Sequence, residues 1–577
     1  MDNERFTQQH GHDDEKLIDN RNSKSQEAVE PRTLDCFLYF LEEPVVDSMT
    51  KNHTKIFIWL GVAISIMAVA LPFFGKGNPD RAYITSPMKA RGAIRDASGT
   101  ELTQYGEKES AWLNLSAARK WHDSHPEEWD RFAASVAEGL KIPRQTIDGY
   151  LNSYSQFRYL KRWLSPDESG RLRHVLNQEW SMPRETVRIR REPATYFPFG
   201  EHLAQLLGFT NIDGKGANGL EFHYEKELAG RVNSAYWSFK SRKGIDLYLT
   251  IDMDLQTDCE NLAEEYMKKY GAESVEAVVL RASDSRVLAI VSRPSFDPND
   301  FRAALHQHMR LRPVTDLFQL GPMIQPFLMA EGIGNGGDGF SAQRVPGSSG
   351  TLSEAFLGRS PQAPQHMSKE LGMEGILRAI SRFRLNQRTG VDFGDDPLPI
   401  VAQGGASEKA LSKYSQGHGV AVSLYRLALS FCSLVNGGEL REPKFLDRLG
   451  MPDGEMRKLP ESPVYKVIKP EISAEMRKLM KEIVKRSGNG EASPDWGGMW
   501  ATYQPKLHHS LPRNHHVAAA LFAPVDRPEV VVVLKMILPR DARRPGRDIG
   551  LHMSGEILEA ALLHLDDKQK GDAHEHR

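Results

Sequence analysis

Residues 56–75 limit the folding of this chain more than any other segment, because they run for twenty residues without a charge between Lys55 and Lys76. At 1.5 Å per residue, a helix of this length spans the hydrocarbon core of a bilayer. A buried helix of a globular domain rarely lacks a polar face over such a length. The residues before it are too many and too acidic for a secretory signal peptide. The sequence therefore predicts a transmembrane helix over 55–76, preceded by a polar tail at 1–54.

The remaining composition is that of a globular protein with more than one domain. The chain has 577 residues, of which 40% are hydrophobic and 26% are charged. Its formal net charge of -2 gives no indication of nucleic-acid binding. Cys36, Cys259 and Cys432 lie far apart, and no carboxylate set has metal-ligand spacing. The sequence therefore predicts no disulfide framework, metal or cofactor.

Strand patterns at both ends of the C-terminal half, with helical patterns between them, predict an α+β domain. A strand at 244–252 leads into a helix with Asp252 or Asp254 as its N-cap and Gly271 after its end. Residues 275–294 and 515–538 each hold two apolar strands around a turn, and residues 555–567 form a closing helix. These elements predict a central antiparallel sheet covered by helices.

Several short motifs occur in a fixed order along the chain. They are RGAIRDASGTEL at 91–102, YFPFG at 196–200, LGF at 207–209, GLEFHY at 219–224, LTID at 249–252, PSFDPN at 294–299, TG at 389–390, GHG at 417–419 and NGG at 436–438. In this order and spacing they resemble class B penicillin-binding proteins, and most closely the division-specific peptidoglycan D,D-transpeptidases. The resemblance covers nearly all of 91–565.

The resemblance implies a fold, a location and partners. The fold is α+β, with the N-terminal transmembrane helix, an elongated pedestal domain at 77–240 and a penicillin-binding transpeptidase domain, similar to serine β-lactamases, at 241–565, before a tail at 566–577. Positive charges flank both ends of the predicted membrane helix and do not decide its orientation. The resemblance places the tail in the cytoplasm and the body in the periplasm of a bacterial inner membrane. It also implies contact with a membrane-embedded glycan polymerase and other division proteins.

An active member of this family needs three motifs, S-x-x-K, S-x-N and K-T-G, for an acyl-serine reaction. The first aligns with residues 321–327, GPMIQPF, where the flanking Gly321, Pro326 and Phe327 are kept. The nucleophile position then holds Pro322, which has no hydroxyl and no backbone N–H for an oxyanion hole. The base position holds Gln325, a neutral amide. Proline is nevertheless well tolerated at the start of a helix, so the helix is expected to form.

The other two motifs are also altered. The resemblance places S-x-N at 359–361, where the sequence has Arg359 and Pro361. It places K-T-G in the segment 496–502, WGGMWAT, with Gly498 and Met499 at the motif and no lysine in either register. Two nearby serines do not restore the first motif; Ser348 has Thr351 three residues on, and Ser349 has Leu352.

These substitutions favour a pseudoenzyme that acts as a scaffold or regulator of a glycan polymerase complex in peptidoglycan synthesis and cell division. Two alternatives stay open. One is an active D,D-transpeptidase with an unrecognised nucleophile, and the other is a non-covalent cell-wall sensor. The glycine-rich segment 332–340 suggests a phosphate loop at first sight, but no Lys-Ser/Thr follows and a flexible turn is expected there.

Overall fold

The computed structural model describes residues 91–230, 243–348, 350–402, 407–487, 493, 495–505, 514–540 and 548–575. The predicted tail at 1–54 and transmembrane helix at 55–76 lie outside the described residues. Among the residues that are described, no helix is both long and apolar enough to cross a membrane. All described residues belong to one compact unit, Pro87–Arg577.

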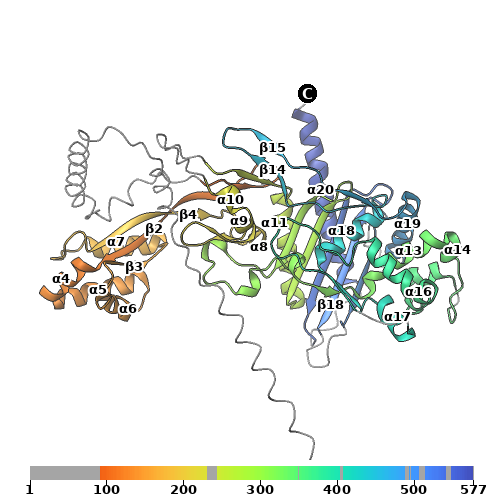
Figure 1. The fold of residues 1–577 in the computed structure, drawn as a ribbon, viewed down its shortest axis with the longest axis horizontal. Coiled ribbons are helices and arrows are strands. Elements are labelled where there is room, and N and C mark those ends of the chain that lie inside the picture. Colours follow the sequence, from red (N-terminus) through yellow and green to blue (C-terminus); the bar gives the residue numbers. More distant parts are fainter. Residues whose placement is uncertain are drawn as a thin grey trace, which may run out of the picture. The chain divides into compact units, whose positions relative to one another are not determined.

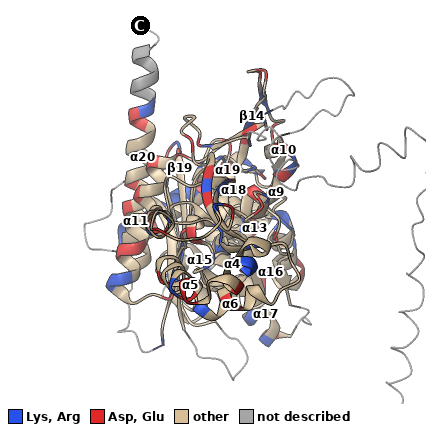
Figure 2. Ribbon diagram, turned by 90° about the vertical axis from the view of Figure 1, so that its left-hand side faces the viewer, with Lys and Arg blue, Asp and Glu red and all other residues tan. Residues whose placement is uncertain are grey.

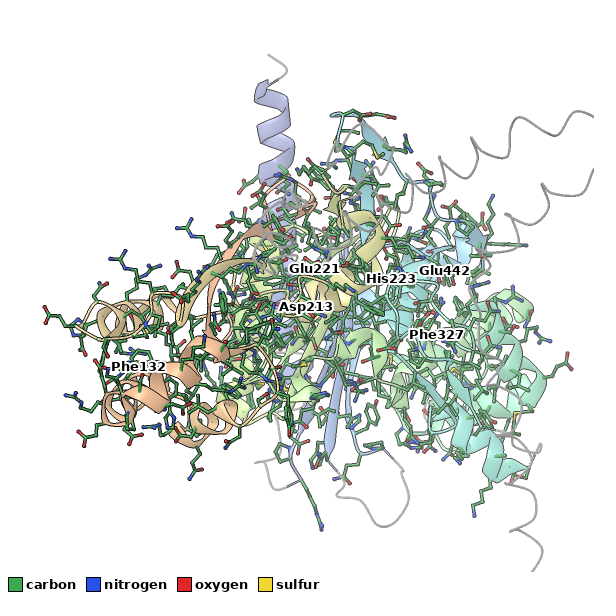
Figure 3. All side chains as sticks on the ribbon, turned by 60° about the vertical axis from the view of Figure 1, so that its left-hand side comes forward. Phe132, Asp213, Glu221, His223, Phe327 and Glu442 are labelled. Atoms are coloured by element: carbon green, nitrogen blue, oxygen red, sulfur yellow. The ribbon has the colours of Figure 1, made fainter. Side chains whose placement is uncertain are left out.

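The first part of this unit is a three-stranded antiparallel sheet in the order β3-β2-β4, here called the pedestal sheet. Its strands are β2 (Gln104–Asn114), β3 (Phe157–Lys161) and β4 (Val187–Tyr196). Side chains alternate between the two faces of a strand, and one face packs on α4 (Leu115–Ser124), α5 (Pro126–Leu140), α6 (Arg144–Leu151) and α7 (Pro166–Leu176). This small core is separate from the main one; Phe132 lies in it and Phe327 in the main core (Figure 3).

Short elements join the pedestal sheet to the rest of the chain: α8 (Ala204–Leu207), β5 (Phe209–Thr210), β6 (Gly216–Asn218), α9 (Gly219–His223) and α10 (Glu225–Leu228). Leu207 and Leu220 from this region are buried in the main core, so the predicted boundary at 240 does not separate two cores. Arg91 is also buried here, and its Nη2 lies 2.8 Å from Glu225 Oε2. Its Nε donates to Glu221 Oε2 at 2.8 Å.

A second sheet joins distant parts of the sequence in the order β1-β7-β14-β15. Its strands are β1 (Ile94–Arg95), β7 (Asp246–Leu249), β14 (Leu446–Gly450) and β15 (Met456–Lys458). The first pair is parallel, with Ile94 opposite Leu247. The motif that follows the predicted membrane helix is thus held directly by the strand that opens the C-terminal domain.

The central sheet is antiparallel and has five strands in the order β17-β18-β19-β8-β9. They are β8 (Ser274–Arg281), β9 (Val287–Arg293), β17 (Gly497–Tyr503), β18 (His515–Ala523) and β19 (Val530–Leu538). The helices α11 (Met253–Tyr270) and α20 (Ile549–Glu575) cover one face and α18 (Leu424–Val435) covers the other (Figure 1). Both predicted hairpins and the α+β fold are therefore confirmed.

The ends of α11 follow from local chemistry. The Asp252 side chain accepts hydrogen bonds from the N–H groups of Asp254 and Leu255, and Gly271 ends the helix at φ +60°. The closing helix α20 extends to Glu575, past residue 565 where the sequence predicts the domain to end. Both signs of charge follow one another along it (Figure 2).

The remaining elements lie between β9 and β17. The helices are η1 (Pro298–Asp300), η2 (His306–His308), α12 (Arg312–Thr315), η3 (Gly321–Ile324), α13 (Gln325–Gly336), α14 (Asp338–Ser341), α15 (Leu352–Leu357), α16 (Gln362–Arg382), α17 (Glu408–Ser415) and α19 (Pro470–Arg486). The strands are β10 (Phe318–Gln319), β11 (Ile400–Val401), β12 (Val420–Val422), β13 (Glu439–Arg441) and β16 (Val464–Lys466).

The glycine-rich segment 332–340 is not the turn that its composition predicts, because it is helical through Gly336 and again in α14. A Cβ at Gly332 would lie 2.0 Å from the Phe340 ring. Gly332 therefore allows close packing between α13 and α14, which outweighs its low helix propensity.

Candidate functional site

The first altered segment lies where β10 leads through η3 into α13. Pro322 occupies the first turn, where an N–H group would have no partner within the helix. Met323 and Ile324 are fully buried, and Gln325 opens α13 with 9% of its surface exposed. The expectation that a proline here leaves the helix intact is confirmed.

Gly321, just before Pro322, is held between two other parts of the chain. Its φ is +54°, and a Cβ there would lie 2.6 Å from the ring of Tyr503. A Cβ at Gly417 would lie 2.1 Å from the carbonyl oxygen of Gly321. The Tyr503 hydroxyl also donates to the carbonyl oxygen of Gln319. The end of β17 and the loop after α17 therefore fix the position of η3.

The second altered segment is the loop between α15 and α16. A capping box formed by Thr351 and Glu354 starts α15, and Pro361 is the N-cap of α16. Arg359 has a left-handed backbone, with φ +53°. Its guanidinium carbon lies 4.7 Å from the ring centroid of Trp500, within the range of a cation–π contact. This loop is thus in contact with β17.

The third altered segment is β17, which lies at one edge of the central sheet beside β18. Met499 lies opposite Ala520 and is buried, and a Cβ at Gly498 would meet the carbonyl oxygen of Ala520 at 2.4 Å. The indole Nε1 of Trp500 donates to Asp548 Oδ1 at 3.0 Å. The segments that carry the first two predicted motif positions therefore both contact β17, which carries the third, through Gly321 with Tyr503 and Arg359 with Trp500.

A buried ion pair lies beneath this region. Lys535 on β19 is directly opposite Glu276 on β8, and Lys535 Nζ lies 2.7 Å from Glu276 Oε2. The side chains are 3% and 0% exposed, and the ammonium lies 5.1 Å from the centroid of the Phe318 ring, just before η3. Burial raises the pKa of the Glu276 carboxyl, although the charge of Lys535 opposes this shift.

Sequence reasoning missed this pair, although a signal was present. The two residues are the charged members of otherwise apolar strand patterns, SVEAVVL and VVVVLKMIL. The charge of Lys535 reaches His516 on β18, whose pKa is lowered to about 4 by burial and by Lys535. This histidine is therefore neutral at physiological pH.

The chemistry of the site follows from these side chains. Pro322 offers no nucleophile, and the Gln325 amide exchanges hydrogen bonds but is no base. Burial raises the pKa of the Tyr503 hydroxyl far above its usual range, so it stays protonated at neutral pH. In the described part of the chain, no three His, Cys, Asp or Glu side chains are grouped to hold a metal ion.

Comparisons with known proteins agree with this fold. Residues 275–537 match the family described as Penicillin binding protein transpeptidase domain. The chain is 24% identical to the probable peptidoglycan D,D-transpeptidase PenA of Neisseria meningitidis serogroup A, over 86% of this chain and 90% of that protein. It is 25% identical to the peptidoglycan D,D-transpeptidase FtsI of Escherichia coli K12, over 71% of this chain and 72% of that protein.

Solved structures show the same fold. The chain resembles penicillin binding protein 3 from Mycobacterium tuberculosis, solved as a complex with aztreonam, with a TM-score of 0.62 and 19% identity. The likeness covers 83% of this chain and 96% of that one. A peptidoglycan synthetase from Bifidobacterium adolescentis gives a TM-score of 0.59 at 16% identity, over the same shares of the two chains.

The relatives also correct one expectation. The altered motif positions led to the interpretation that this chain is not an enzyme, and the comparisons contradict it, because relatives matched over most of their length are named as D,D-transpeptidases. The interpretation rested on one aligned position for each catalytic group. It gave these positions more weight than the alternative of an active transpeptidase with an unrecognised nucleophile.

Proposed function

Because this chain belongs to the class B penicillin-binding proteins, we propose that it works in bacterial peptidoglycan synthesis during cell division. The observation that carries the proposal is the extent of the match. It covers the pedestal sheet as well as the transpeptidase domain, at 86% of this chain and 90% of PenA. A protein that shares both parts with these relatives is expected to work in the same process.

In this proposal the chain is anchored in the inner membrane by residues 55–76. The uncharged run at 56–75 supports the anchor, since its length matches the bilayer core. The tail at 1–54 lies in the cytoplasm and the body lies in the periplasm, where the cell wall is built.

The proposed partners are a membrane-embedded glycan polymerase and other division proteins, and the proposed role is to hold or regulate the polymerase complex. The support comes from the segment just after the anchor. Arg91 is tied by ion pairs to Glu221 and Glu225, and β1 is paired with β7. A partner that moves the start of the pedestal would therefore act directly on the strand that opens the transpeptidase domain. This role does not depend on which residue carries out acyl transfer.

The association is tested by cross-linking in cells. The tagged full-length chain is expected to recover a glycan polymerase from solubilised membranes. A matched chain in which residues 56–75 are replaced by an unrelated transmembrane helix is expected to recover at least about tenfold less polymerase. If the native chain recovers no polymerase, the proposed role is wrong. Equal recovery by both chains would indicate that the polymerase contacts the pedestal and not residues 56–75.

A second experiment finds the residue that takes an acyl group. The full-length chain is incubated with a fluorescent penicillin, denatured and mapped by peptide mass spectrometry. We expect no adduct within 321–325, because Pro322 offers no hydroxyl. The variant Pro322→Ser/Gln325→Lys is expected to label no more than the native chain, because Arg359, Pro361 and Met499 still occupy the other two motifs.

An active class B transpeptidase labelled in parallel shows that the reagent works. An adduct at position 322 of the double variant would contradict the expectation and show that the remaining groups suffice. An adduct elsewhere in the native chain would identify the nucleophile that the sequence does not reveal. A saturable signal that is lost on denaturation would indicate non-covalent recognition instead.

A further inference from the structure

One face of the pedestal sheet is covered by helices, and the other carries an unusual set of side chains. The register places Trp112 of β2 opposite Tyr159 of β3 and opposite Arg188 of β4, so all three share the outward face. Phe157 lies on the same face, two residues before Tyr159. The inward residues Leu113 and Val187 belong to the pedestal core. We call the outward set Trp112, Phe157, Tyr159, Arg188 and Arg190 the aromatic face.

The rings of this face are in contact across the strands. The centroids of Trp112 and Phe157 are 5.9 Å apart, and those of Phe157 and Tyr159 are 6.1 Å apart. Phe157 is 46% exposed, and Tyr154 in the loop before β3 is fully exposed. Large aromatic side chains left in water in one place are a common mark of a binding surface. Figure 2 views the molecule from the side on which the pedestal helices lie, with α4, α5 and α6 in front.

Guanidinium groups accompany the rings. Arg188 is exposed, and its guanidinium carbon lies 5.9 Å from the centroid of Trp112. Arg190 lies opposite Ser110 on the same face. The acidic side chain that shares this face on β4 is Glu192, which is buried and accepts hydrogen bonds from Arg162, Ser110 and Tyr159. The exposed part of the face is therefore aromatic and positively charged.

We propose that the aromatic face binds peptidoglycan strands, and this rests on the proposed function in the cell wall. The C–H faces of sugar rings carry partial positive charge, which packs well on the electron-rich faces of Trp, Tyr and Phe. Stem peptides carry free carboxylates, which arginine binds through paired hydrogen bonds. A sheet face with rings and guanidinium groups side by side offers both contacts to one polymer.

The composition of the face favours a glycan over a protein. Around Trp112, the outward strand positions are Ser110, Trp112, Asn114, Phe157, Tyr159, Arg188 and Arg190, and none of them is aliphatic. Protein interfaces also favour aromatic residues and arginine, so the choice of a glycan rests on the absence of aliphatic side chains here and on the arginines that match stem-peptide carboxylates. A flat face with guanidinium groups between its rings fits an anionic carbohydrate better.

The test is co-sedimentation of the full-length chain, in mild detergent, with purified peptidoglycan sacculi. The variant Phe157→Ser/Arg188→Glu is expected to bind at least about tenfold more weakly than the native chain, a change of about 1.4 kcal/mol. The matched control is Arg191→Glu, which makes the same charge change three residues away on β4. Arg191 lies opposite Glu109, so it points to the other side of the sheet, and binding is expected to stay within about twofold. Arg188→Glu alone keeps the test decisive if the double variant unfolds.

A second probe separates the two contacts. Sacculi whose free carboxylates have been converted to neutral amides with a carbodiimide and ammonia keep the sugars and the cross-links but lose the negative charge. The native chain is expected to bind them more weakly, and Arg188→Glu is expected to make no further difference. Equal binding of intact sacculi by native and double-variant chains would overturn the inference. The inference would also be overturned if the double variant still bound sacculi but no longer cross-linked to a protein that the native chain captures. If sacculus binding fails while the glycan polymerase is still recovered from membranes, the inference falls and the proposed function stands.

Discussion

Replacing Arg91 by methionine is expected to lower the free energy of unfolding by about 3–5 kcal/mol, the usual cost of removing one partner from a buried ion pair. Arg91 is 5% exposed and Glu221 is fully buried, so the variant would leave the Glu221 carboxylate without its counter-charge. Burial already raises the pKa of Glu221 against the opposing effect of Arg91. The measurement is urea unfolding of the full-length chain in detergent, followed by tryptophan fluorescence.

Two variants make this result specific. Arg95→Met removes a nearby arginine whose partner Glu101 is 40% exposed, and it is expected to cost less than about 1 kcal/mol. The double variant Arg91→Met/Glu221→Leu removes both charges and is expected to regain most of the loss. If Arg91→Met costs no more than Arg95→Met, the buried cluster does not hold the start of the pedestal in place.

Replacing Lys535 by methionine is expected to have a similar cost, about 3–5 kcal/mol at neutral pH. The Glu276 carboxyl would then be buried without its cation, on a strand in the middle of the central sheet. The loss is also expected to depend on pH. Burial raises the pKa of Glu276 in the folded state above its ordinary value of 4.5, so the folded chain holds this proton more tightly than the unfolded chain. The contribution of Glu276 to stability is therefore greatest below pH 4.5 and is lost as pH rises through the folded pKa.

The pH profile of urea unfolding between about pH 4.5 and 8 measures this effect. The slope is expected to be steeper in Lys535→Met than in the native chain, because the variant lacks the charge that opposes the shift. Glu276→Gln/Lys535→Met removes the titrating group and is expected to flatten the profile. A Lys535→Met variant whose stability does not change with pH would show that the Glu276 carboxyl ionises as readily in the folded chain as in the unfolded chain, and would contradict the raised pKa.

Much of the fold follows from local sequence signals. Asp252 marks the start of α11 because its side chain accepts hydrogen bonds from the first N–H groups of the helix. Gly271 marks the end because its left-handed backbone closes the last turn. The two hairpins of the central sheet follow from apolar runs on either side of short turns. These signals are local, so they can be read without knowing what each element packs against.

The contacts that assemble the site are not local, and they could not be predicted. Gly321 and Tyr503 are far apart in sequence, and only the folded chain shows that the tyrosine ring takes the space of a side chain at 321. The contact of Arg359 with Trp500 depends in the same way on the placement of an edge strand beside a loop. The segment 332–340 was predicted wrongly for the same reason. Its glycine content indicates a turn, but the packing of Gly332 against Phe340 stabilises a helix there.

The sheet β1-β7-β14-β15 has a consequence for the order of folding. β7 ends at Leu249 and its partner β14 begins at Leu446, so about 200 residues must be made after β7 before that edge is paired. At roughly 5–20 residues per second, this takes about 10–40 s of synthesis. During that time the N–H and C=O groups on the open side of β7 have no strand partner, which exposes a site for mispairing with other chains. The newly made chain is therefore most vulnerable to aggregation midway through its synthesis, after β1 and β7 are complete and before β14 arrives.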